Sequence, residues 1–473
     1  MVFQNNVLLG ASGSGTTAYE IDQSIRFNDD DSAILIASQT GAGDTRKKNT
    51  FSVWVKRGNL TSLMYIGAYR YDATNYQLYS FDSSDRLEFA DVSGGSVIGK
   101  LITNRVFRDP SAWYNLTFVW DTANAVSTER MIIYVNGVRE TSFNTATYPS
   151  VNTDSGGAGR GSSTMRIGTY DATGNYLDGC LTNIVYVDNS ALDASSFGET
   201  NDNGIWIPKD VSGLTFGTRG FYIDGRDSSD LGDDESGQGN DFTTSGLTAA
   251  DQMLGSPTNN FCTPNPLDNY YCACTFSNGN MIVDTSNTPY SYFTTTQKIP
   301  TSGKWYAECR AYETTGHMLL GIAQEPAQNN QHYLGHYSTN YAYYNYNGKS
   351  ITGTTQSTYG NTYTNGDIIG IAVDMDNNKL YFSKNGTFQN SGAPTSGSTG
   401  TGAISITGGV DYFYAGSDYG SGSASDFRWN FGQDPTFSDG PSAGGNSDAN
   451  GIGNFKYSVP SGYLALCTKN LGS

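Results

Sequence analysis

The residues best suited to chemistry in this chain are carboxylates crowded between Gly220 and Phe242, in the segment GFYIDGRDSSDLGDDESGQGNDF. Calcium takes about six to eight hard oxygen ligands, which carboxylates, amides and the carbonyls of Gly-rich turns can supply. We therefore predict a candidate calcium site here, and the alternative is a solvated acidic loop that binds no metal. The candidate ligands are Asp224, Asp227, Asp230, Asp233, Asp234 and Asn240.

Tyrosines form the second concentrated group, between Tyr333 and Tyr346, where they are interleaved with asparagine and histidine. A tyrosine presents a flat apolar face and a hydroxyl, and few of its bonds must be ordered on binding. Such side chains stack on sugar rings or on the anchor residues of a protein partner. The alternative is that alternate tyrosines pack within a strand or pair across subunits. The candidate ligand-binding residues are Tyr333, His336, Tyr337, Tyr341, Tyr343, Tyr344 and Tyr346.

The chain has three histidines, and none of them falls in a catalytic motif. His332 and His336 have the i, i+4 spacing of a zinc-binding helix, but Gly335 and the surrounding tyrosines favour a loop or strand edge, and the sequence has no H-E-x-x-H motif. It also lacks a G-x-S-x-G elbow, a phosphate-binding loop and a dinucleotide fingerprint. Because the paired acids of a glycosidase strand are missing as well, we expect no enzymatic activity.

Charge and cysteine usage narrow the classes of partner and compartment. The net charge of −18 opposes nucleic-acid binding, because a phosphate backbone would be repelled. The six scattered cysteines predict free, mostly buried thiols in a chain that folds in a reducing compartment. Cys272 and Cys274 form a C-x-C pair that we interpret as structural, since a metal would need further ligands. With no signal-peptide pattern and no apolar run near ~20 residues, we expect no membrane insertion.

The elements that must position these side chains are β-strands. A composition of 57 glycines, 33 tyrosines and only 15% charged residues is typical of a turn-rich β protein. The clearest pattern is TNGDIIGIAVDMDNNKLYFSKNG, from Thr364 to Gly386. Apolar residues alternate on both sides of an MDNN turn, and the final Asn385-Gly386 accepts positive φ. This pattern predicts an antiparallel hairpin buried on at least one face.

Further motifs surround that hairpin in a fixed order, with SGKWYAECRA and MLLGIAQ before it and FRWNFGQDP and PSGYLALC after it. Together they resemble the SPRY domain, over residues 269–473. The resemblance implies an antiparallel β-sandwich that binds partners through its loops. Because the loops of this chain are rich in Gly, Ser, Thr and Tyr, the partner preferences of the family do not transfer to it.

The first half carries FSVWVKRGN, YNLTFVW, IIYVNG and LDGCLTNIVYVDNSALD. These motifs resemble the laminin-G-like, or concanavalin-A-like, jelly roll, which we assign to residues 21–250 and whose members often carry one calcium. In that family the strand and turn found here at 220–242 normally open the domain. We therefore predict a displaced closing strand at Phe221–Ile223, and the alternative is an acidic interdomain linker.

The remaining segments complete the predicted domain organisation. Residues 1–20 read as a Gly/Ser/Thr-rich N-terminal arm, and residues 251–268, with three prolines and no periodicity, read as the linker. The predicted fold class is therefore all-β, with two antiparallel β-sandwich domains, a laminin-G/concanavalin-A-like jelly roll followed by a SPRY-like sandwich.

The combination of the two modules resembles virion proteins of tailed phages. The strings SIRFNDDDSA, FSVWVKRGN and PSGYLALCTKNL carry this resemblance. It implies a virion structural protein, a tail fibre or tail-associated component, that binds host-surface glycans or proteins through its loops. The alternative is a capsid- or tail-decorating protein that binds mainly neighbouring virion subunits. In either case we expect a homo-oligomer that assembles in the host cytoplasm with other virion proteins.

Overall fold

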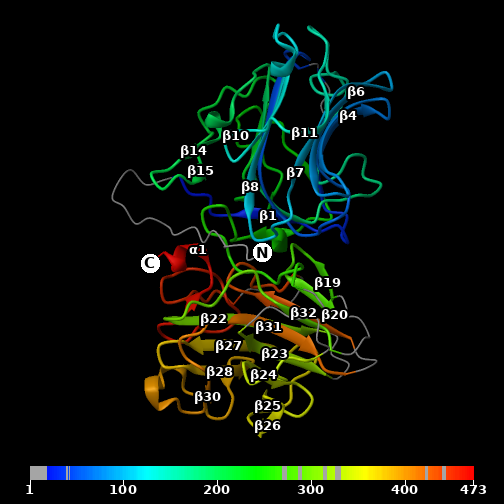
Figure 1. The fold of residues 1–473 in the computed structure, drawn as a ribbon. Helices are drawn as coiled ribbons and strands as arrows, with labels where there is room; N and C mark the ends of the chain where they lie inside the picture. The colour runs from blue at the N-terminus through cyan, green and yellow to red at the C-terminus, as the bar shows by residue number, and fades with distance from the viewer. Residues whose placement is uncertain are drawn as a thin grey trace. The chain divides into compact units, whose positions relative to one another are not determined.

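The structure is a computed structural model that describes residues 19–38, 41, 43–268, 274–285, 290–312, 317–324, 332–420, 424–438 and 444–472. The described chain consists of β-strands with a few short helical turns, and it divides into two compact units between Thr258 and Asn259 (Figure 1). Both units are built from sheets whose strands pair antiparallel, except for the short parallel pair of β22 (Lys304–Tyr312) and β33 (Leu464–Ala465), which confirms the predicted all-β class with two sandwiches. None of the described helices is long and apolar enough to cross a membrane.

Two eight-stranded sheets form the N-terminal unit. In spatial order, the first sheet consists of β10 (Val138–Arg139), β9 (Met131–Val135), β8 (Trp113–Asp121), β3 (Lys48–Arg57), β13 (Gly179–Asp188), β1 (Ser24–Phe27) and β18 (Gln252–Met253), with β16 (Phe221–Ile223) beside β13. The second consists of β11 (Phe143–Thr147), β7 (Ser96–Val106), β6 (Arg86–Ser93), β5 (Asn75–Phe81), β4 (Met64–Asp72), β12 (Thr164–Ile167), β2 (Ile34–Ser38) and β17 (Thr243–Ser245). Short additional elements are β14 (Gly198–Thr200), β15 (Trp206–Pro208), η1 (Ser127–Glu129), η2 (Ala194–Ser196) and η3 (Ala249–Asp251).

The core of this unit lies between its two sheets and is largely aromatic. Alternate residues of β8, Phe118 and Trp120, are fully buried, as period-2 alternation requires. Phe51 of β3 stacks on Tyr79 of β5 with ring centroids 4.5 Å apart, so rings from the two sheets meet directly. Such contacts add about 0.5–1.5 kcal/mol beyond the burial of the rings themselves.

The segment Phe221–Ile223 forms β16, which pairs antiparallel with β13. Phe221 is fully buried and stacks on Tyr186 at 5.7 Å, while Phe242 packs edge-on against it at 4.8 Å. The chain from 220 to 242 therefore leaves the first sheet, forms an acidic loop and returns to the core. Apolar burial at both ends of this segment explains why it is not a solvated linker.

Residues 251–268, predicted as a linker, are folded in both units rather than free. Gln252–Met253 is β18, which pairs with β1 in the N-terminal unit. In the C-terminal unit Phe261 forms a β-bridge with Cys467, and Phe261 and Cys262 are buried. The prolines interrupt regular pairing here, but the apolar residues between them are buried and hold the chain in place.

The C-terminal unit contains a nine-stranded and a six-stranded sheet. In spatial order, the first consists of β19 (Cys274–Ser277), β20 (Ile282–Thr285), β32 (Ser425–Asn430), β22 (Lys304–Tyr312), β27 (Ile368–Asp374), β28 (Lys379–Lys384) and β29 (Thr387–Phe388), with β30 (Ile404–Ser405) beside β28 and β33 (Leu464–Ala465) beside β22. The second consists of β21 (Tyr292–Thr294), β31 (Phe413–Asp418), β23 (Met318–Ala323), β24 (Asn340–Tyr344), β25 (Lys349–Thr352) and β26 (Thr355–Thr358). Two short helices, η4 (Pro394–Thr399) and α1 (Thr468–Leu471), complete the unit.

The predicted hairpin is β27 and β28, and every residue of β27 is buried. β27 lies between β22 and β28 within the sheet, and the residues that point to either side of it are buried. The closing Asn385-Gly386 has φ values of 48° and 79°, the left-handed region that this dipeptide tolerates. The sheets meet through rings, with Phe293 of β21 packed edge-on against Phe427 of β32 at 5.1 Å.

Five cysteines lie in the described part of the chain, and all of them are free thiols. Burial raises the pKa of the Cys467 thiol to about 12, so this group stays protonated and unreactive near neutral pH. Cys272 lies outside the described residues, so the structure describes only Cys274 of the C-x-C pair, which is buried in β19.

Candidate binding site

One end of the six-stranded sheet collects aromatic side chains from segments that are far apart in the sequence. The antiparallel pairs Met318–Asp418 and Leu319–Tyr344 bring the start of β23 beside the ends of β31 and β24. His317 precedes β23, so its ring lies at the same edge. The strand register alone therefore assembles residues separated by about a hundred positions.

The rings at this edge touch one another in a continuous cluster. His317 stacks on Tyr346 at 5.2 Å, and its Nδ1 is hydrogen-bonded to the Tyr344 hydroxyl. Tyr419 meets Tyr333 edge-on at 4.3 Å. We call this group the histidine–tyrosine platform, and its members are Tyr290, His317, His332, Tyr333, His336, Tyr337, Tyr344, Tyr346 and Tyr419.

His332 and His336 lie in the loop between β23 and β24, and not on a helix. Their rings are stacked with centroids 3.6 Å apart and an interplanar angle of 3°. Burial, with the neighbouring His332, lowers the pKa of His336, so its imidazole is neutral at physiological pH. Within the described ranges, no three His, Cys, Asp or Glu side chains are grouped so that they could hold a metal. The pair is therefore suited to stacking and hydrogen bonding.

The structure divides the seven predicted ligand-binding residues into two sets. Tyr337 and Tyr346 are 41% and 65% exposed, and Tyr333 and His336 are half-buried in the platform. The other three lie on β24 and are at most 5% exposed, so they present no face to a ligand; these are Tyr341, Tyr343 and Tyr344.

The strand geometry of β24 explains this burial. Tyr343 points into the gap between the sheets and packs against Tyr363 at 5.1 Å and Phe382 at 5.3 Å. Tyr344 points to the opposite face, where Leu334 packs in the same buried cluster. The sequence pattern of alternating tyrosines thus describes a buried strand, and the exposed rings lie just before and just after it.

Four platform residues were not among the predicted ligand-binding residues, and they are Tyr290, His332, His317 and Tyr419. The last two are placed in the platform by strand pairing. No local pattern marks either of them, because each lies at a strand end and joins the platform only through the pairing of β23 with β24 and β31. Their position directly beside predicted strands is the only signal that could have suggested them.

Most of the predicted calcium ligands in the N-terminal unit already make hydrogen bonds or an ion pair with neighbouring residues. The Asp234 carboxylate accepts from four donors, which are the backbone N–H groups of Tyr222, Ser236 and Asn240 and the Ser236 hydroxyl. The Asn240 side-chain amide donates to the backbone carbonyl of Gly220 at 2.8 Å. Asp234 therefore holds the acidic loop to the start of β16.

The other acidic side chains of this segment point to separate local partners. Asp224 forms an ion pair with Arg226, and Asp227 accepts hydrogen bonds from the Ser229 backbone and hydroxyl. Asp230 accepts a hydrogen bond from the Gly232 backbone at 3.2 Å. Slight desolvation, followed by repulsion from neighbouring aspartates, raises the pKa of Asp233. Several of these carboxylates cap their own turns, and among the described residues no three His, Cys, Asp or Glu side chains are grouped so that they could hold a metal.

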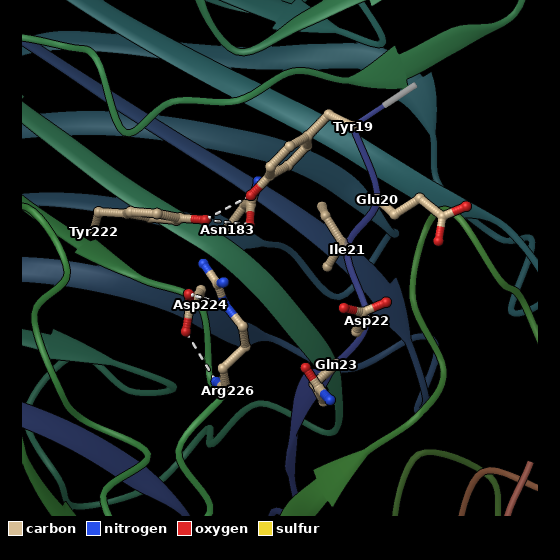
Figure 2. A pocket seen from close by; sticks show the side chains of 9 residues that line it. All are labelled: Tyr19, Glu20, Ile21, Asp22, Gln23, Asn183, Tyr222, Asp224 and Arg226. Atoms are coloured by element: carbon tan, nitrogen blue, oxygen red, sulfur yellow. Dashed lines mark hydrogen bonds and ion pairs between the residues drawn. The ribbon is translucent and has the colours of Figure 1, made fainter. Parts of the chain in front are cut away.

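A small pocket of about 40 Å³ lies beside this segment (Figure 2). Its two tyrosine hydroxyls point at one another and at an amide, with Tyr19 and Tyr222 joined at 2.9 Å and Tyr222 donating to Asn183 at 3.1 Å. Burial raises the pKa of Tyr222 well above its usual value. A volume of this size holds one or two water molecules and not a sugar ring.

Fold and site together define a protein of two β-sandwich modules with an aromatic surface at one edge of the second. Family models agree with this architecture: residues 28–195 match the concanavalin A-like lectin/glucanases superfamily, and residues 304–404 match the SPRY domain. The chain therefore contains a laminin-G-like, concanavalin-A-like domain followed by a SPRY domain.

Solved structures also resemble parts of the chain. The SPRY domain of human HERC1 is 19% identical, with 35% of this chain and 96% of that chain covered and a TM-score of 0.29. A candidate carbohydrate binding protein from Bacteroides ovatus is 15% identical, with 49% of this chain and 60% of that chain covered and a TM-score of 0.34. A search of curated proteins gave no match.

Proposed function

We propose that this chain is a non-enzymatic binding protein of a tailed-phage virion, a tail fibre or tail-associated component that binds host-surface glycans or proteins. The observation that carries the binding role is the histidine–tyrosine platform, where exposed rings of Tyr337 and Tyr346 adjoin half-buried His317 and Tyr333. The virion assignment rests on the sequence resemblance of the two modules and their flanking strings to phage virion proteins.

The platform suits weak, repeated binding. Its rings are already packed on one another, and the Tyr344 hydroxyl is bonded to His317, so little side-chain freedom remains to be lost when a ligand docks. Flat tyrosine faces stack on the apolar faces of sugar rings, while imidazole and hydroxyl groups satisfy sugar hydroxyls. Many copies on one particle would convert a modest single-site affinity into strong adsorption.

A second candidate is a decorating protein that binds mainly neighbouring virion subunits. One observation favours it: β26, an edge strand of the six-stranded sheet, has all four of its residues exposed. Such an edge offers unpaired backbone groups to a strand of another chain. This candidate predicts tight contact with purified virions and no binding to cells.

The test uses the full chain against host cells and a glycan array. We expect Tyr346→Ala and Tyr337→Ala to reduce binding, each by roughly tenfold, because truncating a tyrosine that anchors an interface costs more than about 1 kcal/mol. Val138→Ala, which trims a side chain of 67% exposure in the other unit, is the matched control and should bind as the wild type does. Equal binding by all of these variants would exclude the platform.

The virion assignment has its own experiment. Antibodies against the chain, viewed by electron microscopy on purified particles, should label tails or tail fibres. Labelling of the capsid would favour the decorating role, and particles without label would contradict both.

A further inference from the structure

Two arginines on the outer face of the N-terminal unit's second sheet have no hydrogen-bonding partner in the described chain. Arg166 of β12 lies opposite Ala68 of β4, and Thr164 lies opposite Arg70, so the two guanidinium groups occupy diagonal positions on one face. Arg70 Nε and Arg166 Nε and Nη1 are buried, yet no acceptor reaches them from any described residue. Buried N–H donors normally find acceptors, because a buried donor that makes no hydrogen bond costs free energy.

Other arginines of this unit show that the chain can pair such groups. Arg26 is bonded to Asp251 at 2.9 Å, and buried Arg57 is bonded to Asp85 at 3.1 Å. With 45 acidic residues against 27 basic ones, carboxylates are in surplus. Two adjacent guanidinium groups without a carboxylate partner are therefore a specific feature of this face.

Two acids whose charges act on residues of this face are already engaged. Asp171 accepts hydrogen bonds from the Thr173 backbone and hydroxyl, and Glu88 is paired with Lys100 at 2.7 Å. Burial and repulsion from Arg70 together lower the pKa of Arg166, although Asp171 partly offsets this. A bound anion would relieve that repulsion.

Three tyrosines surround the arginines. Tyr170, in the loop after β12, lies 4.9 Å from Tyr76 and 5.5 Å from Tyr65, and the Arg70 guanidinium lies over its ring at 5.2 Å. All three rings are partly buried and pack on a small apolar cluster of Ala68, Leu78 and Ala90. The face thus joins flat apolar surface to unpaired positive charge.

We infer that this face binds an acidic sugar, whose carboxylate or sulfate is held by Arg70 and Arg166 while its ring packs against Tyr65, Tyr76 and Tyr170. A guanidinium fork matches both oxyanions with two parallel hydrogen bonds. The inference goes beyond the proposed function, because that function rests on the platform in the other unit, and either site can fail without the other.

The test measures calorimetric binding of three probes to the full chain at low salt: tetragalacturonate, a carrageenan tetrasaccharide and neutral maltotetraose. We expect at least one acidic probe to bind and maltotetraose to bind at least about tenfold more weakly, since a charge-assisted pair is worth that factor. The acidic probe that binds distinguishes carboxylate from sulfate. If neither acidic probe binds at up to about 10 mM, a range that detects even the weakest useful sites, the inference is wrong.

Variants then assign the site. Arg70→Gln and Arg166→Gln should each weaken acidic-probe binding by about tenfold or more, and Arg166→Lys should fall between, because an ammonium keeps the charge but loses the fork. Arg139→Gln removes the same charge from β10 of the other sheet, where Arg139 forms a partly exposed ion pair with Glu129 of η1, and this variant should bind normally. Tyr346→Ala should also bind normally, which separates this site from the platform.

Thermal melting accompanies each variant. Arg166 has no hydrogen-bonding partner to lose, so Arg166→Gln should melt at or above the wild-type midpoint. Arg70→Gln loses only the contact of its guanidinium with the Tyr170 ring and should melt slightly lower, by the equivalent of about 0.5–1 kcal/mol. Both variants should remain folded at the temperature of the binding experiment, so lost binding reports the site and not unfolding. Acidic-probe binding that is equal in wild type, Arg70→Gln and Arg166→Gln would overturn the assignment.

Discussion

Removing the Asp234 carboxylate should destabilise the N-terminal unit to the same extent with and without calcium. Asp234 is 8% exposed and accepts hydrogen bonds from three backbone N–H groups and one hydroxyl. In Asp234→Ala the Tyr222 N–H loses its acceptor at 2.8 Å where the side chain of Tyr222 is only 2% exposed, so water does not readily replace it. The other donors lie at the loop surface, where water replaces part of the loss.

The expected size follows from these contacts. One buried unsatisfied N–H costs about 1–3 kcal/mol, and the partly hydrated donors add about 1 kcal/mol together. A loss of about 3 kcal/mol in a unit of this size lowers the melting midpoint by roughly 6–12 °C. The acidic loop would also detach from the start of β16, so the effect should be confined to the transition of the N-terminal unit.

Differential scanning calorimetry of the full chain, in calcium and in a chelator, provides the measurement. Asp227→Ala is the matched control, because Asp227 is exposed and holds only its own turn through Ser229. We expect the wild type to melt at the same temperature in both buffers, Asp227→Ala to follow it, and Asp234→Ala to melt lower in both. A wild-type midpoint that falls on chelation, together with a calcium-dependent loss in Asp227→Ala, would show instead that these side chains ligate a metal.

Three further predictions concern the cores and the platform. Burial raises the pKa of Asp91 and of Glu308 to about 7, from 3.8 and 4.5, so the folded protein binds these protons more tightly than the unfolded protein does. The stability that this tighter binding contributes is present below about pH 4 and is lost as the pH rises towards 7. Calorimetry between these pH values measures the loss, and Asp91→Asn should flatten the dependence of the N-terminal unit's melting temperature on pH. Gly416→Ala would place a Cβ 2.4 Å from the Phe293 ring and should cost the C-terminal unit about 1–3 kcal/mol in urea denaturation, whereas an unchanged midpoint would mean that the ring moves freely. Tyr344→Phe removes the hydroxyl bonded to His317 and should cost about 1 kcal/mol, with weaker ligand binding if His317 then turns away from Tyr346.

The fold was accessible from the sequence because period-2 alternation and Asn-Gly turns are local signals. The hairpin of β27 and β28 carries both, and its strands and turn lie where the pattern places them. The apolar triplet Phe221–Ile223 likewise stands out against an acidic background and forms β16. The burial of both faces of β27 could not be predicted from the sequence, because it depends on what covers the sheet.

Only part of the candidate binding site could be predicted from the sequence, for physical reasons. Alternating tyrosines mark a strand and an aromatic surface equally well, and only the position of Leu334 against Tyr344 shows that the outer face of β24 is covered. Closely spaced aspartates suit calcium ligation and turn capping alike, since both need oxygens at short intervals. An arginine without a partner, such as Arg166, is invisible in sequence because its acceptor could come from any distant segment.

The two surfaces differ in the force that would hold a ligand, and this difference bears on how the modules act together. The platform depends on ring stacking and hydrogen bonds, which salt barely affects, whereas a guanidinium pair attracts its anion through a field that salt screens over about 8–10 Å. When two modules on one chain bind the same cell surface, binding of the first module raises the effective concentration for the second contact without adding any new interaction. Adsorption that used both surfaces would therefore weaken in high salt to the level of the platform alone and would not vanish. If the chain binds through both surfaces, it would favour cells whose glycan coat offers neutral rings together with acidic groups over cells that offer only one of the two.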